Sequence, residues 1–195
     1  MLDSVPGWIY RYDRNDRQTG RLGGPAAQLY HPRGLAIDLD GNLYIADTGG
    51  CRVVKLSPAG EVVAKFGSKG TGRGQFVEPT DVAVGPNGLM YVADAGNRRV
   101  VILDAGGGYV GEWAAPQSVA YNGIHLALSQ TGLLLVTDPE AGRLLGYDIG
   151  GRMLQQTGGK GAEPGQLAIP VGVLAAPDGR VYVVEVGNQR VQVFR

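Results

Sequence analysis

Several features of common functional classes are missing from this 195-residue sequence. There is one cysteine, Cys51, so no internal disulfide can form and no cysteine cluster can bind zinc. No apolar run approaches the ~18 residues that a membrane-spanning helix needs, and residues 1–7 show neither the basic nor the apolar region of a signal peptide. These absences leave the compartment open. Basic and acidic residues balance at 18 each, which does not indicate a dominant electrostatic partner such as duplex DNA.

Glycine and proline, by contrast, are abundant, with 33 and 11 residues. Both interrupt helices and favour turns. Hydrophobic residues make up 44% of the chain, which is enough for a core, and no segment has sustained helical periodicity. The composition therefore predicts an all-β protein of many short strands and tight turns.

A seven-residue segment recurs four times along the chain. Each copy begins with glycine, continues with apolar residues and ends with an acid, and an arginine follows five residues after that acid. The copies are Gly41–Asp47, Gly88–Asp94, Gly132–Asp138 and Gly179–Glu185, and their glycines are 47, 44 and 47 residues apart. A period of 40–50 residues is typical of β-propeller blades.

Each repeat has the signals of four short antiparallel strands. In the first repeat we expect strands at 35–37, 43–46 and 52–56, and a fourth that ends at Phe66. The Asp-Gly or Asn-Gly pair between the first two strands is a strong hairpin signal. Four strands with glycine and aromatic residues at fixed places describe one blade.

The repeated residues resemble the NHL repeat. Its pattern is a proline before an apolar strand, then Asp/Asn-Gly-x-x-Tyr-Val/Ile-Ala-Asp, then Gly-Asn-x-Arg-Val, and the best matches are Pro79–Val101 and Pro170–Val193. The resemblance covers about residues 30–195, with departures at Gly50 (usually Asn) and Glu185 (usually Asp) and in the third repeat, which lacks the leading proline and the tyrosine. It implies a β-propeller, typically six-bladed, that acts by binding other molecules.

We expect residues 1–195 to form one propeller domain or a propeller fragment. A partial blade spans 8–23, and the repeats span about 30–67, 75–113, 118–157 and 166–195. Two arrangements are open. In a closed four-bladed ring, the N-terminal strand would complete the last blade. In an arc of a six-bladed ring, open blade edges would be available for self-association.

The acids and arginines of the repeats form a regular set. A ring of carboxylates that binds a cation is one interpretation, but every repeat has the pair, and we expect structural ion pairs within the blades. The residues are Asp47, Arg52, Asp94, Arg99, Asp138, Arg143, Glu185 and Arg190.

Polar residues that differ between repeats are expected where the innermost strands begin, near the channel mouth. We predict a ligand-binding site there, formed by His31, Arg33, Glu78, Asp81, Asn122 and His125. Two histidines and two carboxylates can also ligate a metal or transfer protons, so a metal at the mouth is left open.

The favoured function is a non-catalytic scaffold that presents the linker face to a protein or polymer ligand and needs no cofactor. One alternative is a metal-dependent lyase or hydrolase, because some NHL-like propellers resemble amidating lyases with a histidine-bound metal. Two histidines are, however, too few for a three-histidine site. A second alternative is single-stranded RNA binding, which the zero net charge and few aromatic residues on that face disfavour.

Overall fold

The computed structural model describes residues 1–4, 7–116 and 123–195. These residues form antiparallel sheets, with only two short 3₁₀ helices among them, η1 (Gly24–Ala27) and η2 (Ala95–Asn97). Neither helix is long and apolar enough to cross a membrane. The chain is therefore an all-β protein, as its composition predicts.

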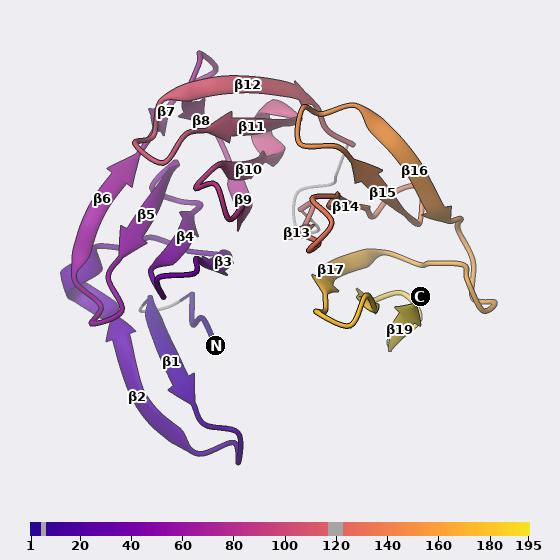
Figure 1. The fold of residues 1–195 in the computed structure, drawn as a ribbon, viewed down its shortest axis with the longest axis horizontal. Coiled ribbons are helices and arrows are strands. Elements are labelled where there is room, and N and C mark those ends of the chain that lie inside the picture. The colour runs from indigo at the N-terminus through magenta and orange to yellow at the C-terminus, as the bar shows by residue number, and fades with distance from the viewer. Residues whose placement is uncertain (5–6, 117–122) are drawn as a thin grey trace.

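Three sheets have four strands each, joined in chain order as a meander. The first blade contains β3 (Gly34–Ile37), β4 (Leu43–Asp47), β5 (Arg52–Leu56) and β6 (Val62–Phe66). The second contains β9 (Pro79–Val84), β10 (Met90–Asp94), β11 (Arg99–Leu103) and β12 (Tyr109–Ala114). The third contains β13 (Leu126–Leu128), β14 (Leu134–Asp138), β15 (Arg143–Tyr147) and β16 (Met153–Gly158). Their first strands lie innermost, as propeller blades require (Figure 1).

Shorter sheets lie at the two ends of the arrangement. The N-terminal hairpin consists of β1 (Trp8–Tyr12) and β2 (Gln18–Gly23), and the fourth blade of β17 (Pro170–Ala175), β18 (Val181–Glu185) and β19 (Arg190–Phe194). A closed four-bladed ring would need β2 to pair with β19, but β2 pairs with β1 alone. The strand exchange of a closed ring is thus not formed, and of the two open arrangements the blades follow the arc, with an open side between the hairpin and the fourth blade (Figure 1).

The hydrophobic core lies between successive sheets. We call the side of a sheet that points to the next sheet in the chain its forward face, and the other side its rear face. In β10, Tyr91 and Ala93 point forward into one core cluster, whereas Met90 and Val92 point back into another. Side chains alternate along a strand, so a strand between two blades must be apolar on both faces. All residues of β4, β10 and β14 are accordingly buried.

Buried threonines add hydrogen bonds between neighbouring blades. Thr48 Oγ1 donates to the carbonyl of Pro79 at 2.7 Å, and Thr80 Oγ1 donates to the carbonyl of Ile124 at 3.1 Å. Both acceptors lie at or just before the innermost strand of the following blade. These bonds help to set where each innermost strand begins.

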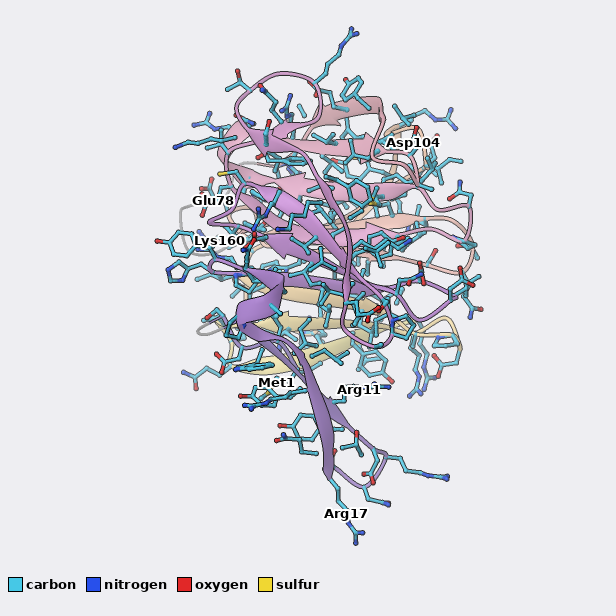
Figure 2. All side chains as sticks on the ribbon, turned by 90° about the vertical axis from the view of Figure 1, so that its left-hand side faces the viewer. Met1, Arg11, Arg17, Glu78, Asp104 and Lys160 are labelled. Atoms are coloured by element: carbon cyan, nitrogen blue, oxygen red, sulfur yellow. The ribbon has the colours of Figure 1, made fainter. Side chains whose placement is uncertain are left out.

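The blades present two opposite edges. The linker edge holds the connections between blades and the turns between second and third strands, and the turn edge holds the remaining turns. Glu78 and Lys160, on linkers, lie on one side of the molecule, and Asp104, in a turn after a third strand, lies on the other (Figure 2). The first linker contains a parallel pair of two-residue strands, β7 (Ser68–Lys69) and β8 (Gln75–Phe76).

Candidate functional site

In the first, second and fourth blades, the acid at the end of the second strand holds the linker that enters its own blade. In the second blade, Asp94 Oδ1 accepts the backbone N–H groups of Val77 at 3.0 Å and Glu78 at 3.2 Å. Its Oδ2 accepts the amide of Asn97 at 2.6 Å and Nε of Arg99 at 3.2 Å. Asp94 is fully buried. A buried carboxylate with four donors is satisfied by the protein itself.

The arginine of the same pair reaches back to the linker. Nη1 of Arg99 donates to the carbonyl of Thr71 at 3.1 Å and to Glu112 at 2.8 Å. Nη2 donates to the carbonyls of Gly72 at 3.0 Å and Gln75 at 2.7 Å. The guanidinium therefore fastens the linker to the third strand of the blade, using the fork geometry that lysine lacks.

The other blades repeat this pair with different numbers of contacts. The remaining pairs are Asp47–Arg52 and Asp138–Arg143 at 2.8 Å and Glu185–Arg190 at 2.7 Å. In the third blade, Arg143 is 38% exposed and, among the described residues, donates to Asp138 and to Gln156. Each acid is paired with its own arginine, as expected of structural ion pairs within the blades, and we call these pairs staples.

Glu185 shows how the staple affects ionisation. Burial on its own would raise the pKa of this carboxyl group. Hydrogen bonds from Arg190, the backbone of Ala168 and the amide of Asn188 outweigh burial and lower the pKa below its ordinary value. The pair thus keeps a buried carboxylate ionised.

Two predicted mouth residues, Asp81 and His125, meet across the second and third blades. Nδ1 of His125 lies 3.3 Å from Oδ2 of Asp81. The same oxygen accepts the backbone N–H of Leu126 at 2.9 Å, and Oδ1 accepts that of Val82 at 2.9 Å. Asp81 is thus a buried acceptor that ties β9 to the start of β13. If Nδ1–H of His125 points to Asp81, Nε2 is left as an acceptor for a ligand, and the imidazole is 29% exposed.

A second polar pair joins the first and second blades. Nη1 of Arg33 lies 3.2 Å from Oε1 of Glu78, and both side chains are about one-third exposed. His31 is not part of this pair: it has φ +50° in the linker and stacks on Tyr30, with ring centroids 4.5 Å apart. The sixth predicted residue, Asn122, lies outside the described residues.

The mouth is polar on three blades and apolar on the fourth. The fourth blade has Ile169, Val171 and Gly172 where the second has Glu78, Thr80 and Asp81. The three fourth-blade residues are all partly exposed. The linker edge therefore offers two charged pairs and, across the channel, an aliphatic border.

Within residues 1–4, 7–116 and 123–195, no three His, Cys, Asp or Glu side chains come together as a metal site. Asp81 and His125 supply two possible ligands. Either group could also exchange a proton with a ligand at the mouth.

Sequence reasoning missed a hollow of about 360 Å³ near the turn edge, between the third and fourth blades. It is lined by Leu135, Leu144, Thr157, Val181 and Phe194, among others. Thr157 occupies the fourth-strand position that holds Phe66 in the first blade and Trp113 in the second. Each of these residues pairs with the second residue of its third strand, which is Val53, Val100 or Leu144. That substitution is the sequence signal that would have pointed to the hollow.

Comparison with known proteins gives a consistent picture of the fold. The family model of the NHL repeat matches residues 29–56, 76–103 and 167–194. No curated protein sequence matches the chain.

Solved structures match at low sequence identity. A streptogramin B lyase structure has a TM-score of 0.71 and 18% identity over 98% of this chain and 62% of its own. A chain from a nidogen–laminin complex has a TM-score of 0.69 and 18% identity, and the match covers 99% of this chain and 72% of that one. Myxococcus xanthus glutaminyl cyclase has a TM-score of 0.63 and 15% identity, and the match covers 100% of this chain and 86% of that one. The chain thus spans about three-fifths of the length of the lyase.

At such identity these structures establish the fold alone. The repeat matches add the sequence pattern of the blades. They cover the first, second and fourth blades, and the third keeps the same strand order and the same acid–arginine pair. The chain is therefore a β-propeller with NHL repeats in its first, second and fourth blades.

Proposed function

We propose that the protein is a non-catalytic binding module whose linker edge binds a protein or polymer ligand at the channel mouth. The observation that carries this proposal is a break in symmetry. The Asp/Glu–Arg staples recur in every blade, whereas the mouth residues Arg33, Glu78 and His125 have no counterpart of the same kind in the fourth blade. Residues that only hold blades together are free to repeat, but a ligand that contacts several blades needs a different group on each.

The chemistry at the mouth fits an extended peptide. Arg33 and Glu78 form a pair, about one-third exposed, that can exchange partners with charged or amide groups. His125 offers Nε2, and Tyr30 is an aromatic side chain 61% exposed at the same edge. The aliphatic border at Ile169 and Val171 suits an apolar side chain. Peptide backbone and mixed side chains match this combination better than a uniformly charged polymer does.

The two alternatives have less support. The named enzymes among the matched structures, streptogramin B lyase and glutaminyl cyclase, raise a catalytic role. In this chain, however, such a role would rest on Asp81 and His125, and Asp81 already holds two backbone N–H groups. RNA binding would need a basic edge, and the mouth pairs its one arginine with Glu78. The matched chain from a nidogen–laminin complex is an example of a similar propeller within a protein complex.

Selection of peptides tests the proposal. A phage-displayed library of random dodecapeptides is selected on the wild-type protein, and the affinities of selected peptides are measured by biolayer interferometry. We expect a loss of roughly tenfold or more for Arg33→Ala/Glu78→Ala and for His125→Ala, since each lost ligand hydrogen bond is worth about 1.4 kcal/mol. Asp81 is left intact because its substitution would disturb the fold.

The matched control is Asp178→Ala/Arg180→Ala, which removes an exposed ion pair at the turn edge. Its affinities are expected to stay within about twofold of wild type. Selected peptides that bind the mouth variants as tightly as wild type, or that depend on the turn-edge pair instead, would refute the proposed site.

A further inference from the structure

The forward face of the fourth blade differs from every other forward face in the arc. Cross-strand pairing places five apolar residues side by side there, Leu174, Tyr182, Val184, Val191 and Val193. We call this set the terminal patch. Four of these residues are 44–60% exposed. The equivalent apolar residues of the second blade, which are covered by the third blade, are 0–5% exposed.

The terminal patch is also bulkier than the forward faces inside the arc. Leu174 lies on the first strand of the blade, opposite Tyr182 on the second. At this position the three earlier blades have an alanine, which is Ala36, Ala83 or Ala127. Val184 stands where Ala46, Ala93 and Thr137 stand. Small residues at these places let consecutive blades approach closely. Their replacement by leucine and valine fits a partner surface other than the next identical blade.

The terminal patch carries no charged residue. Gly172 pairs with Val184 and faces the same side as the five apolar residues, and it adds no charge. Arg180 borders the patch at the turn edge, with its guanidinium 5.5 Å from the ring of Tyr182. A neutral aliphatic surface is complementary to another surface of the same kind.

The opposite end of the arc does not match it. The N-terminal hairpin carries Arg11, Arg14, Arg17 and Arg21, with Arg21 stacked on Trp8. Arg17 lies at the tip of the hairpin, beyond the body of the molecule (Figure 2), whereas Arg11 donates to the carbonyl of Pro58 in the first blade. On the face of the hairpin turned away from the first blade, Arg21 lies beside Trp8 and Tyr10. Docking the terminal patch there would bring this guanidinium against bare aliphatic side chains, so a head-to-tail contact is disfavoured.

We propose that the terminal patch is a dimer interface, in which two copies pack the forward faces of β17–β19 against each other about a two-fold axis. The contact continues the sheet-on-sheet packing that joins the blades within the chain. It is isologous, so the same residues are buried in both copies and no open filament results. The linker edge of each copy stays accessible.

The size of the terminal patch limits the affinity. Three strands about 4.8 Å apart and five residues long, at about 3.4 Å per residue, offer a few hundred Å² per copy. A standard stable interface buries about 800 Å² per partner. We therefore expect a reversible dimer that dissociates on dilution through the micromolar range.

Sedimentation velocity over about 2–200 µM tests the proposal. The wild-type sedimentation coefficient should rise from monomer to dimer, whereas Val184→Lys and Leu174→Lys/Val191→Lys should stay monomeric throughout. The matched controls are Val63→Lys and Val110→Lys, which change exposed valines of β6 and β12 and should dimerise as wild type does. Circular dichroism verifies that every variant keeps its β-sheet signal.

Disulfide trapping tests the symmetry. In a Cys51→Ser background, Val184→Cys and Val191→Cys are oxidised as separate single-cysteine proteins. At least one should form a covalent dimer, while Val63→Cys should not. A wild type that stays monomeric at the highest concentration, a dimer that survives the lysine variants, or loss of the dimer on Tyr12→Lys in the hairpin would each overturn the proposal.

Discussion

The two arginines Arg99 and Arg143 occupy the same position of their repeats but differ in what they hold. Arg99 is 10% exposed and donates to Asp94, Glu112 and three linker carbonyls. Arg143 is 38% exposed and donates to Asp138 and Gln156. If the arginines act as structural staples, alanine at the two positions should have clearly different costs.

The magnitudes follow from the contacts. Arg99→Ala leaves a fully buried carboxylate without its cation, a change that typically costs 3–5 kcal/mol. Asp94 keeps two backbone N–H groups and the amide of Asn97, so we expect about 3 kcal/mol. Arg143→Ala also leaves a buried carboxylate, since Asp138 is 5% exposed, but the guanidinium it removes is 38% exposed and can be replaced by water, so we expect about 1–2 kcal/mol.

Urea unfolding followed by circular dichroism measures the free energy of unfolding of both variants. Hydrogen exchange then locates the damage, which for Arg99→Ala should be greatest in linker residues 68–76. Arg99→Lys should recover only part of the loss, because an ammonium cannot reproduce the fork of contacts. Equal costs at the two positions, or a cost below about 1 kcal/mol at Arg99, would refute the staple reasoning.

Two further predictions concern the buried acid of the fourth blade and the turns. The folded state lowers the pKa of Glu185 from its ordinary 4.5, so its contribution to stability is present above that value and is lost as the pH falls through the folded pKa. The difference in unfolding free energy between wild type and Glu185→Gln should therefore shrink as the pH falls below 4.5, and a difference that grows there would contradict this. Gly107 has φ +85° and a Cβ there would collide with the ring of Phe66, so Gly107→Ala should cost about 2 kcal/mol or more. Gly179→Ala, with φ +84° and open space around it, should cost only about 1 kcal/mol in the same urea assay.

Strand positions were predictable because local signals and the repeat agree. The predicted third strand at 52–56 matches β5, and the expected hairpin at Asp40-Gly41 joins β3 to β4, with Gly41 at φ +80°. Turn chemistry and apolar alternation act over a few residues. Four copies in register removed the ambiguity that a single short strand leaves.

Contacts across blades were not predictable in the same way. Asp81 and His125 were expected at the mouth, but only the rotation between blades brings Asp81 within reach of the Leu126 N–H. The sequence gives no sign that this carboxylate is a structural acceptor. Likewise His31 falls in the same repeat position as Glu78, yet its left-handed backbone turns it towards Tyr30 instead of Arg33. Both outcomes depend on the direction that the backbone takes in the linkers. The residue types of a linker determine that direction only weakly.

The repeats also give a way to separate scaffold from function. A residue that stabilises one blade is equally useful in the next, so the acid–arginine staples and the turn glycines recur. Departures at matching positions therefore need another cause. They fall in two regions, the mixed polar and apolar mouth at the linker edge and the enlarged terminal patch on the fourth blade. The two regions lie on different surfaces and share no residue, so a variant that abolishes dimerisation should leave peptide affinity at the mouth unchanged.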